Sequence, residues 1–205
     1  GKDSFKYMED FKETKEQIRK RHLLMRNDMP REERLALSDI ISIHAQKLIK
    51  LPQKNGHKVR VYGYYPLGSE VSLISFYKFL LKGEVPLAFP RVQGMSMDFY
   101  QVFSLDDLKE GAFHVMEPDN ACKKAGWEYA LCFTPGSAFD REGGRFGYGK
   151  GYYDRYFEKH PRLLRAGIAY ENQVEEKLPT EDFDIPINYL ITEQGISCGK
   201  EQKWN

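Results

Sequence analysis

Segments with the apolar period of a helix alternate with strand-like segments along this chain, and that alternation limits the folds open to it. Apolar residues recur with helical spacing over 4–26, and after Pro30 a second helical segment reaches about residue 48. Asp28 and Ser69 are the side chains expected to cap the second and third helices. Further segments follow, with strands predicted at 59–66, 85–92, 97–103, 127–135, 164–170 and 188–192 and helices at 69–81 and 152–159. The sequence therefore predicts an α/β fold, a single layered domain over residues 1–205 with a mostly parallel central sheet flanked by helices.

The composition is that of an ordinary globular domain and argues against several classes of partner. Apolar residues make up 41% and charged residues 30% of the 205 residues, and the formal net charge is only +1. A chain so nearly neutral is not expected to bind nucleic acid or a membrane surface. The three cysteines show no C-x-x-C spacing, which favours reduced thiols and a cytoplasmic location. No apolar run approaches the length of a membrane span, and no signal-peptide pattern opens the chain.

One glycine-rich stretch, GGRFGYGKGYYDR (143–155), stands between a predicted buried strand and a predicted helix. Gly144, Gly149 and Lys150 fit the phosphate-loop spacing G-x-x-x-x-G-K, but Gly151 replaces the Ser or Thr that would hold Mg²⁺. Glycine amides and the start of the following helix could bind an anion. A solvent-exposed loop that carries surface charges would look the same, so the spacing alone leaves both interpretations open.

The residues of a longer stretch resemble the signature of a known family. TPGSAFDREGGRFGYGKGYYDRYF (134–157) is similar to the signature of the 5-formyltetrahydrofolate cyclo-ligase family, P-G-x-x-F-D, a short turn, then R-L-G-x-G-x-G-Y-Y-D. Phe146 replaces the usual Leu. The matching positions are Pro135, Gly136, Phe139, Asp140, Arg145, Gly147, Gly149, Gly151, Tyr152, Tyr153 and Asp154. Other similar stretches follow in the expected order over most of the chain: KEQIR (15–19), EER (32–34), YPLGSEV (65–71), FPRV (89–92), YENQ (170–173), Leu178-Pro179 and YLITEQGI (189–196).

The resemblance implies an ATP- and Mg²⁺-dependent ligase. Such an enzyme converts 5-formyltetrahydrofolate to 5,10-methenyltetrahydrofolate through a phosphorylated formyl group, an iminium phosphate, and releases ADP and phosphate. The expected partners are these small molecules, and the expected state is a monomer or weak dimer.

The resemblance also implies which residues meet ATP and carry out catalysis. Lys15 and Arg19 lie four residues apart on one helix face and are expected to contact the phosphates. The implied catalytic residues are Arg145, Lys150 and Tyr152. The implied ATP-binding residues of the loop are Arg145, Phe146, Gly147, Tyr148, Gly149, Lys150, Gly151, Tyr152 and Tyr153. Tyr148 stands at a position that is often basic in the family, so any charge supplied there is lost.

The folate and metal residues are implied in the same way. Glu70 matches a glutamate that binds the reduced pterin, and Tyr65 matches a position that lines the substrate. The loop residues implied to contact substrate are Tyr148, Gly149, Lys150, Gly151 and Tyr152. Asp154 is expected to bind Mg²⁺. The family pattern P-x-x-x-x-D-x-x-V-D ends in a second metal-binding Asp, where this chain has Asn188 in PTEDFDIPIN (179–188). An amide oxygen can ligate Mg²⁺ but brings no charge.

Structural alternatives remain for several of these residues. Tyr65 could be a strand-end aromatic, Glu70 a carboxylate near a helix start, and Asn188 the first residue of a strand. Asp140 is expected to fix a turn through its side chain. Two other functions also remain open: a nucleic-acid module built on the basic first helices, and a sugar-phosphate isomerase or acyl transferase on a similar scaffold.

Overall fold

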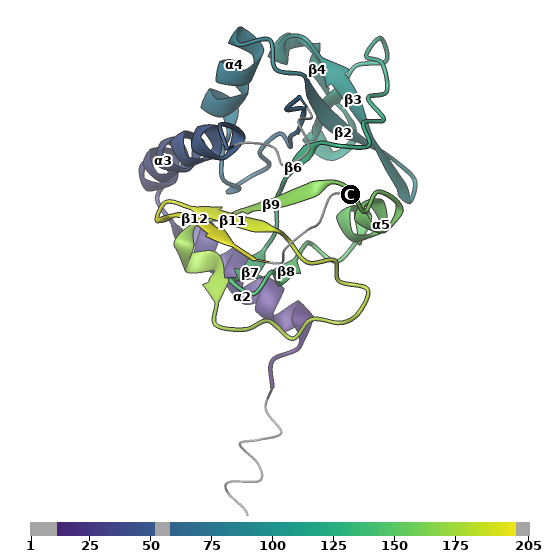
Figure 1. Ribbon diagram of the computed structural model, residues 1–205. Coiled ribbons are helices and arrows are strands. Elements are labelled where there is room, and N and C mark those ends of the chain that lie inside the picture. Colours follow the sequence, from purple (N-terminus) through teal and green to yellow (C-terminus); the bar gives the residue numbers. More distant parts are fainter. Residues whose placement is uncertain (1–11, 52–57, 200–205) are drawn as a thin grey trace, which may run out of the picture.

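The computed structural model describes residues 12–51 and 58–199 and has a seven-stranded central sheet. The strand order is β12-β11-β9-β6-β1-β2-β3 (Figure 1). The five inner strands run parallel, and each edge strand pairs antiparallel with its neighbour. The strands are β1 (Val61–Tyr62), β2 (Leu87–Gln93), β3 (Ser96–Val102), β6 (Leu131–Thr134), β9 (Leu164–Ile168), β11 (Tyr189–Thr192) and β12 (Gly195–Cys198). The predicted fold class is confirmed.

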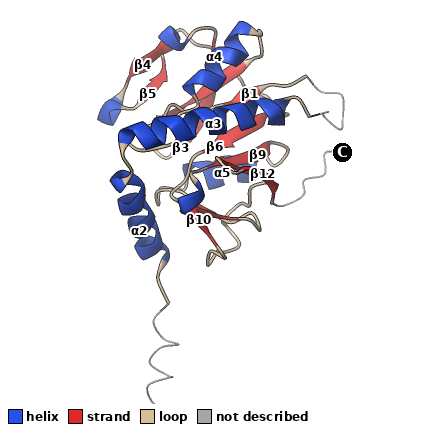
Figure 2. Ribbon diagram, turned by 90° about the vertical axis from the view of Figure 1, so that its left-hand side faces the viewer, coloured by secondary structure: helices blue, strands red, loops and turns tan. Residues whose placement is uncertain are grey.

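Helices cover both faces of this sheet, and alternate side chains of the inner strands decide which helix they meet. In β1, Val61 packs in the cluster with α3 (Arg31–Ile49) and α4 (Ile74–Lys82), while Tyr62 packs on the opposite face with α5 (Tyr152–Lys159). Phe133 and Cys132 of β6 divide in the same way. Figure 2 shows α3 and α4 on the near side of the sheet. Burial on both faces explains the continuously apolar strand sequences.

A second, smaller layer lies beside the carboxyl ends of the inner strands. It consists of β10 (Val174–Glu175), β7 (Ala138–Asp140) and β8 (Arg145–Phe146), in that order. The first described helix, α2 (Lys15–Asp28), packs against this layer and the 3₁₀ turn at Glu171–Gln173. A capping box between Thr14 and Gln17 starts α2. The remaining pair is β4 (Leu108–Glu110) with β5 (Met116–Pro118), near 3₁₀ turns at Leu105–Asp107 and Ala112–His114.

Several predicted boundaries are wrong for identifiable reasons. The third helix begins at Ile74 and is not capped by Ser69, whose hydroxyl accepts a hydrogen bond from Arg26. The second helix begins after Pro30, and Asp28 is instead the last residue of α2. The strand predicted at 127–135 begins only at Leu131. Residues 4–11 of the first predicted helix lie outside the described residues.

Candidate active site

The glycine-rich stretch is divided between a strand and a loop. Arg145 and Phe146 form β8, which pairs with β7, and the loop proper runs from Gly147 to Gly151. Gly149 has a φ of +96° and Gly151 a φ of +70°, so both adopt backbone conformations that favour glycine. Gly151 directly precedes the first turn of α5. The predicted phosphate loop therefore ends, as expected, at the N-terminus of a helix.

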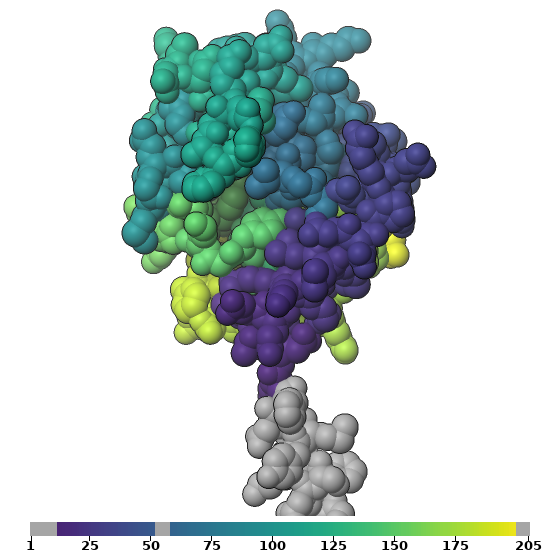
Figure 3. All heavy atoms as spheres, turned by 180° about the vertical axis from the view of Figure 1, so that it is seen from behind, coloured from purple at the N-terminus to yellow at the C-terminus, as the bar shows by residue number. Residues whose placement is uncertain are grey.

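Helix α2 brings two cations to this loop. The Nζ atom of Lys15 lies 5.3 Å and the Cζ atom of Arg19 5.6 Å from the ring centroid of Phe146. A Cβ atom placed on Gly149 would lie 3.6 Å from Nη1 of Arg19. Figure 3 shows the purple surface of α2 against the green surface of the segment that contains the loop. Four predicted ATP-binding residues, Lys15, Arg19, Phe146 and Gly149, are thus brought together.

The two cations differ in how far the protein already neutralises them. Lys15 forms a short contact with Asp184 and lies 3.8 Å from Glu181. Arg19 has no ion pair within residues 12–51 and 58–199, and its buried Nε atom has no hydrogen-bond partner there. A buried guanidinium nitrogen without a partner is costly. An anion at this position would satisfy it.

The other side of the loop reaches Glu70. The hydroxyl of Tyr148 donates to Oε2 of Glu70 at 2.7 Å and accepts from Nη1 of Arg26 at 2.9 Å. Oε1 of Glu70 accepts from the main-chain N–H of Leu67 at 2.8 Å. Burial raises the pKa of Glu70, and it also raises that of Tyr148. Tyr148 therefore links the glycine loop to the predicted folate-binding carboxylate.

Arg26 is a site residue that the sequence analysis missed. Only 5% of Arg26 is exposed, and its guanidinium also donates to Oγ of Ser69 at 2.8 Å and to the carbonyl of Gly136 at 3.3 Å. The sequence did contain a signal that could have assigned Arg26 to the site, because Lys15, Arg19 and Arg26 follow the i, i+4, i+11 spacing of one helix face. That face of α2 is polar and turned toward the site.

Behind the loop, Arg145 and Asp154 lie close together. Only 4% of Arg145 is exposed, and its Nε atom donates to the carbonyl of Pro135 at 2.9 Å. Its Nη1 atom lies 3.8 Å from Oδ1 of Asp154, and its Cζ atom lies 5.2 Å from the ring centroid of Tyr153. The same Asp154 oxygen accepts from the N–H of Ile185 at 3.0 Å. Tyr153 packs beside Phe157, with ring centroids 5.9 Å apart.

Asn188 has a structural role in the sheet. It is 4% exposed, and its Oδ1 atom accepts from the N–H of Arg165 at 2.7 Å. Its own N–H donates to the carbonyl of Arg165 at 2.8 Å, which extends the pairing of β9 and β11. An Mg²⁺ ion would have to share the Oδ1 atom with this hydrogen bond. In the described part of the chain, no three His, Cys, Asp or Glu side chains form a metal-binding group.

The remaining predicted residues have different surroundings. Lys150 is exposed. Tyr152 donates from its hydroxyl to the carbonyl of Gly94 at 2.9 Å. Tyr65 is partly buried and packs on the main core. Asp140 fixes the β7–β8 turn as predicted, because its Oδ1 atom accepts from the N–H groups of Glu142 and Gly144.

A family comparison connects this geometry with known proteins. A model of the 5-formyltetrahydrofolate cyclo-ligase family matches residues 11–193. The chain belongs to this family. A solved 5,10-methenyltetrahydrofolate synthetase from Aquifex aeolicus is similar, with a TM-score of 0.77, 36% identity and coverage of 93% of this chain and 95% of that chain.

Curated relatives of the family also match. The 5-formyltetrahydrofolate cyclo-ligase of Mus musculus is 27% identical over 178 residues, which cover 79% of this chain and 85% of that protein. The protein of that name from Haemophilus influenzae is 42% identical over 62 residues, which cover 29% of this chain. In that bacterial relative the match spans 33% of its length. Separately, no helix among the described residues is both long enough and apolar enough to cross a membrane.

Proposed function

We propose that this chain is an ATP- and Mg²⁺-dependent cyclo-ligase that converts 5-formyltetrahydrofolate to 5,10-methenyltetrahydrofolate. The observation that carries the proposal is the position of one loop, which lies between the cations of α2 and the carboxylate of Glu70. Gly149 lies beside Arg19, whose buried Nε atom has no partner among the described residues, and Tyr148 of the same loop holds Glu70. Such a loop can align an anionic phosphate donor with a ligand that Glu70 recognises.

The chemistry of the substrate explains why two ligands must meet. A formamide oxygen is a poor leaving group, so the γ-phosphoryl group of ATP is transferred to it and ADP leaves. The N10 atom of the folate then attacks the iminium carbon and loses its proton, the C–O bond breaks, and phosphate departs with that oxygen. The protein has to align the reacting atoms, neutralise charge and exclude water.

The cationic residues are assigned to the binding of phosphates and the stabilisation of their charge. Arg19 and Lys15 bind phosphates from α2, and Arg145 and Lys150 stabilise charge on the migrating phosphoryl group. The main chain of Gly147, Gly149 and Gly151 allows close approach of the phosphates, next to the helix N-terminus. Phe146 and Tyr153 support these phosphate-binding residues by packing.

The folate side is assigned to Glu70, Tyr65, Tyr148 and Tyr152. A carboxylate suits the N–H donors of a reduced pterin ring, and the hydrogen bond from Tyr148 keeps Glu70 oriented. Tyr152 stands at the junction between folate and ATP. Glu70 has to release its Tyr148 contact or share it when the pterin binds.

Mg²⁺ binding is assigned to Asp154, with Asn188 as the weaker ligand. A half-buried carboxylate beside a phosphate-binding loop fits Mg²⁺, which commonly takes one or two protein carboxylates together with substrate phosphates. Bound there, Mg²⁺ would neutralise charge on the phosphates of ATP. Asp154 is held for this role by Ile185 and Arg145.

An absorbance assay tests the proposal. Purified protein is mixed with 5-formyltetrahydrofolate, ATP and Mg²⁺, and the methenyl chromophore is followed. We expect the chromophore only when all three are present. No chromophore with the complete mixture would contradict the proposal and would return attention to a nucleic-acid module or an isomerase or transferase. We further propose that the protein acts on small molecules in the cytoplasm, as a monomer or weak dimer.

A further inference from the structure

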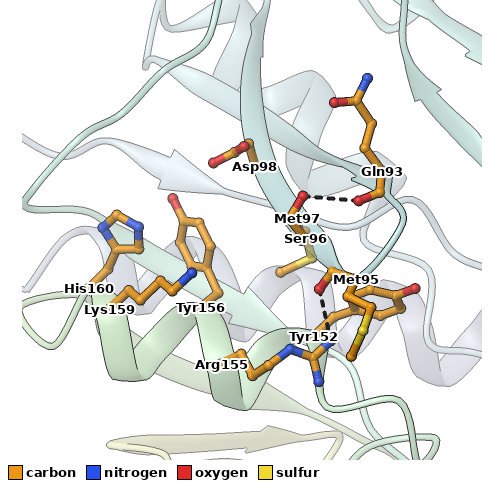
Figure 4. A pocket seen from close by; sticks show the side chains of 10 residues that line it. All are labelled: Gln93, Met95, Ser96, Met97, Asp98, Tyr152, Arg155, Tyr156, Lys159 and His160. Carbon is orange, nitrogen blue, oxygen red and sulfur yellow. Dashed lines mark hydrogen bonds between the residues drawn. The ribbon is translucent and has the colours of Figure 1, made fainter.

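A groove of about 520 Å³ lies between α5 and the turn that joins β2 to β3, and Arg155 is one of the side chains that line it (Figure 4). The Nη2 atom of Arg155 donates to the carbonyl of Met95 at 3.0 Å. Its Nη1 atom donates to the carbonyl of Lys150, in the glycine loop, at 2.7 Å. One guanidinium thus bridges two main-chain segments that are far apart in the sequence.

Tyr152 completes this bridge. The Cζ atom of Arg155 lies 5.2 Å from the ring centroid of Tyr152, and the Tyr152 hydroxyl donates to the carbonyl of Gly94 at 2.9 Å. The consecutive carbonyls of Gly94 and Met95 are therefore both held from the first turn of α5. The guanidinium is therefore held by two hydrogen bonds and a cation–π contact.

The glycine at position 151 makes room for the bridge. A Cβ atom placed on Gly151 would lie 2.7 Å from Nη1 of Arg155, the nitrogen that donates to Lys150. The missing side chain therefore does more than permit the φ of +70°. It also leaves the path along which Arg155 reaches back to the loop.

We propose that Arg155 is a positioning residue for the cyclo-ligase reaction. By holding the carbonyl of Lys150 against the β2–β3 turn, it fixes the main chain of Lys150 and Gly151 at the start of α5, where the phosphates of ATP are proposed to bind. Arg155 acts through the loop and does not itself touch a substrate. The inference rests on the proposed function, because it concerns the precision with which the loop serves that reaction.

Arginine is suited to this task and lysine is not. The planar guanidinium can donate to two carbonyls at once and stack on a ring, whereas an ammonium on a flexible stem cannot keep all three contacts. Small displacements of groups that position reacting atoms reduce the rate strongly. The loss of this bridge should therefore appear mainly in turnover and in the KM for ATP.

The test compares Arg155→Ala and Arg155→Lys with Lys159→Ala as the matched control. Lys159 lines the same groove on the same helix, so its loss removes a like charge without breaking the bridge. We expect Arg155→Ala to lower kcat/KM for ATP by about tenfold or more and Arg155→Lys to fall between it and the wild type. Lys159→Ala should stay close to wild type. Millimolar guanidinium should restore part of the activity of Arg155→Ala and none in the control, with an unchanged melting temperature.

Each result decides the matter. Wild-type activity in Arg155→Ala, or a loss matched by Lys159→Ala, overturns the inference. So does an activity loss that tracks a lowered melting temperature and that guanidinium does not reverse, because a purely structural role predicts it. If Arg155→Ala does not fold, folded Arg155→Lys decides through its turnover: reduced activity supports the inference and full activity overturns it. Failure of the proposed function is distinct, because the wild type itself would then form no methenyl product, and the inference would fall with it.

Discussion

At the scale of single residues, Arg145 is the most enclosed cation of the candidate site. It is 4% exposed, its Nε atom is anchored to Pro135, and its Nη1 atom faces Asp154 at 3.8 Å. A guanidinium fixed in this way needs little reorganisation when charge develops on a phosphoryl group. Its enclosure therefore favours a role in the transition state over a role in ground-state binding.

We expect Arg145→Ala to lower kcat by about 10² to 10³-fold, the range found when a preorganised charge-stabilising donor is removed. The KM values should change much less. Steady-state kinetics measure both, and circular dichroism shows whether the variant is folded. Arg141→Ala is the control, because Arg141 forms a surface ion pair with Glu171. Near-normal turnover of a folded Arg145→Ala protein would refute the assignment.

Glu70 is expected to act in binding. Glu70→Gln should weaken folate binding, because an amide cannot offer two acceptor oxygens to the N–H donors of a pterin. ATP affinity should hardly change. Titration calorimetry with each ligand separates the two effects, and Glu128→Gln, on the surface beside Arg162, is the control. A selective loss of ATP affinity would remove Glu70 from the folate side.

The pKa of Glu70 also predicts a pH effect on stability. Burial raises this pKa above its ordinary value of 4.5, so the folded state binds the proton more tightly than the unfolded state. The resulting stability is present at low pH and is lost as the pH rises through the raised pKa. Over that pH range, the melting temperature of the wild type should fall relative to that of Glu70→Gln. Two thermal-unfolding profiles that stay parallel across the range would contradict the shift.

At the scale of elements, the site depends on how α2, β8, the glycine loop and α5 meet. The motif predicted Arg145, Gly149 and Asp154 as site residues, and their roles stay predictions. The helical spacing paired Lys15 with Arg19, and both side chains do reach the ring of Phe146. The start of α4 was not predictable in the same way. The hydroxyl of Ser69, which was expected to cap this helix, instead accepts a hydrogen bond from Arg26 of α2. Tertiary contacts of this kind override local capping preferences.

The starts of β9 and β11, which Asn188 pairs, carry the prediction about the metal. Asn188 joins these strands through its Oδ1 atom, while Asp154 is tied to Ile185 of the preceding segment. We expect Asp154→Asn to nearly abolish Mg²⁺ binding in the presence of ATP, because it removes the main protein charge. Asn188→Asp should tighten Mg²⁺ binding, since it adds a carboxylate. Calorimetric Mg²⁺ titrations give both affinities.

Asp106→Asn, at an exposed surface aspartate, is the control for that pair. Unchanged Mg²⁺ affinity in Asp154→Asn would exclude Asp154 as the principal ligand. If Asn188→Asp lowers the melting temperature and leaves Mg²⁺ affinity as it was, the role of Asn188 is limited to pairing β9 with β11.

At the scale of the whole molecule, the parallel sheet and its two helical layers bring segments from both ends of the chain to one site. Lys15, near the start of the described residues, contacts Asp184 near their end. The alternation of sequence periods was sufficient to predict the sheet and its layers. It could not predict that β7, β8 and β10 form a separate small sheet, because strands of two or three residues leave almost no periodic signal.

The central claim is that this molecule uses ATP to phosphorylate the formyl oxygen of its substrate. The direct measurement uses 5-formyltetrahydrofolate labelled with ¹⁸O in the formyl group and follows the label by mass spectrometry during turnover with ATP and Mg²⁺. The account predicts that the label appears in the released inorganic phosphate, one oxygen for each methenyl product formed. Methenyl product accompanied by unlabelled phosphate, with the ¹⁸O recovered in water, would contradict it.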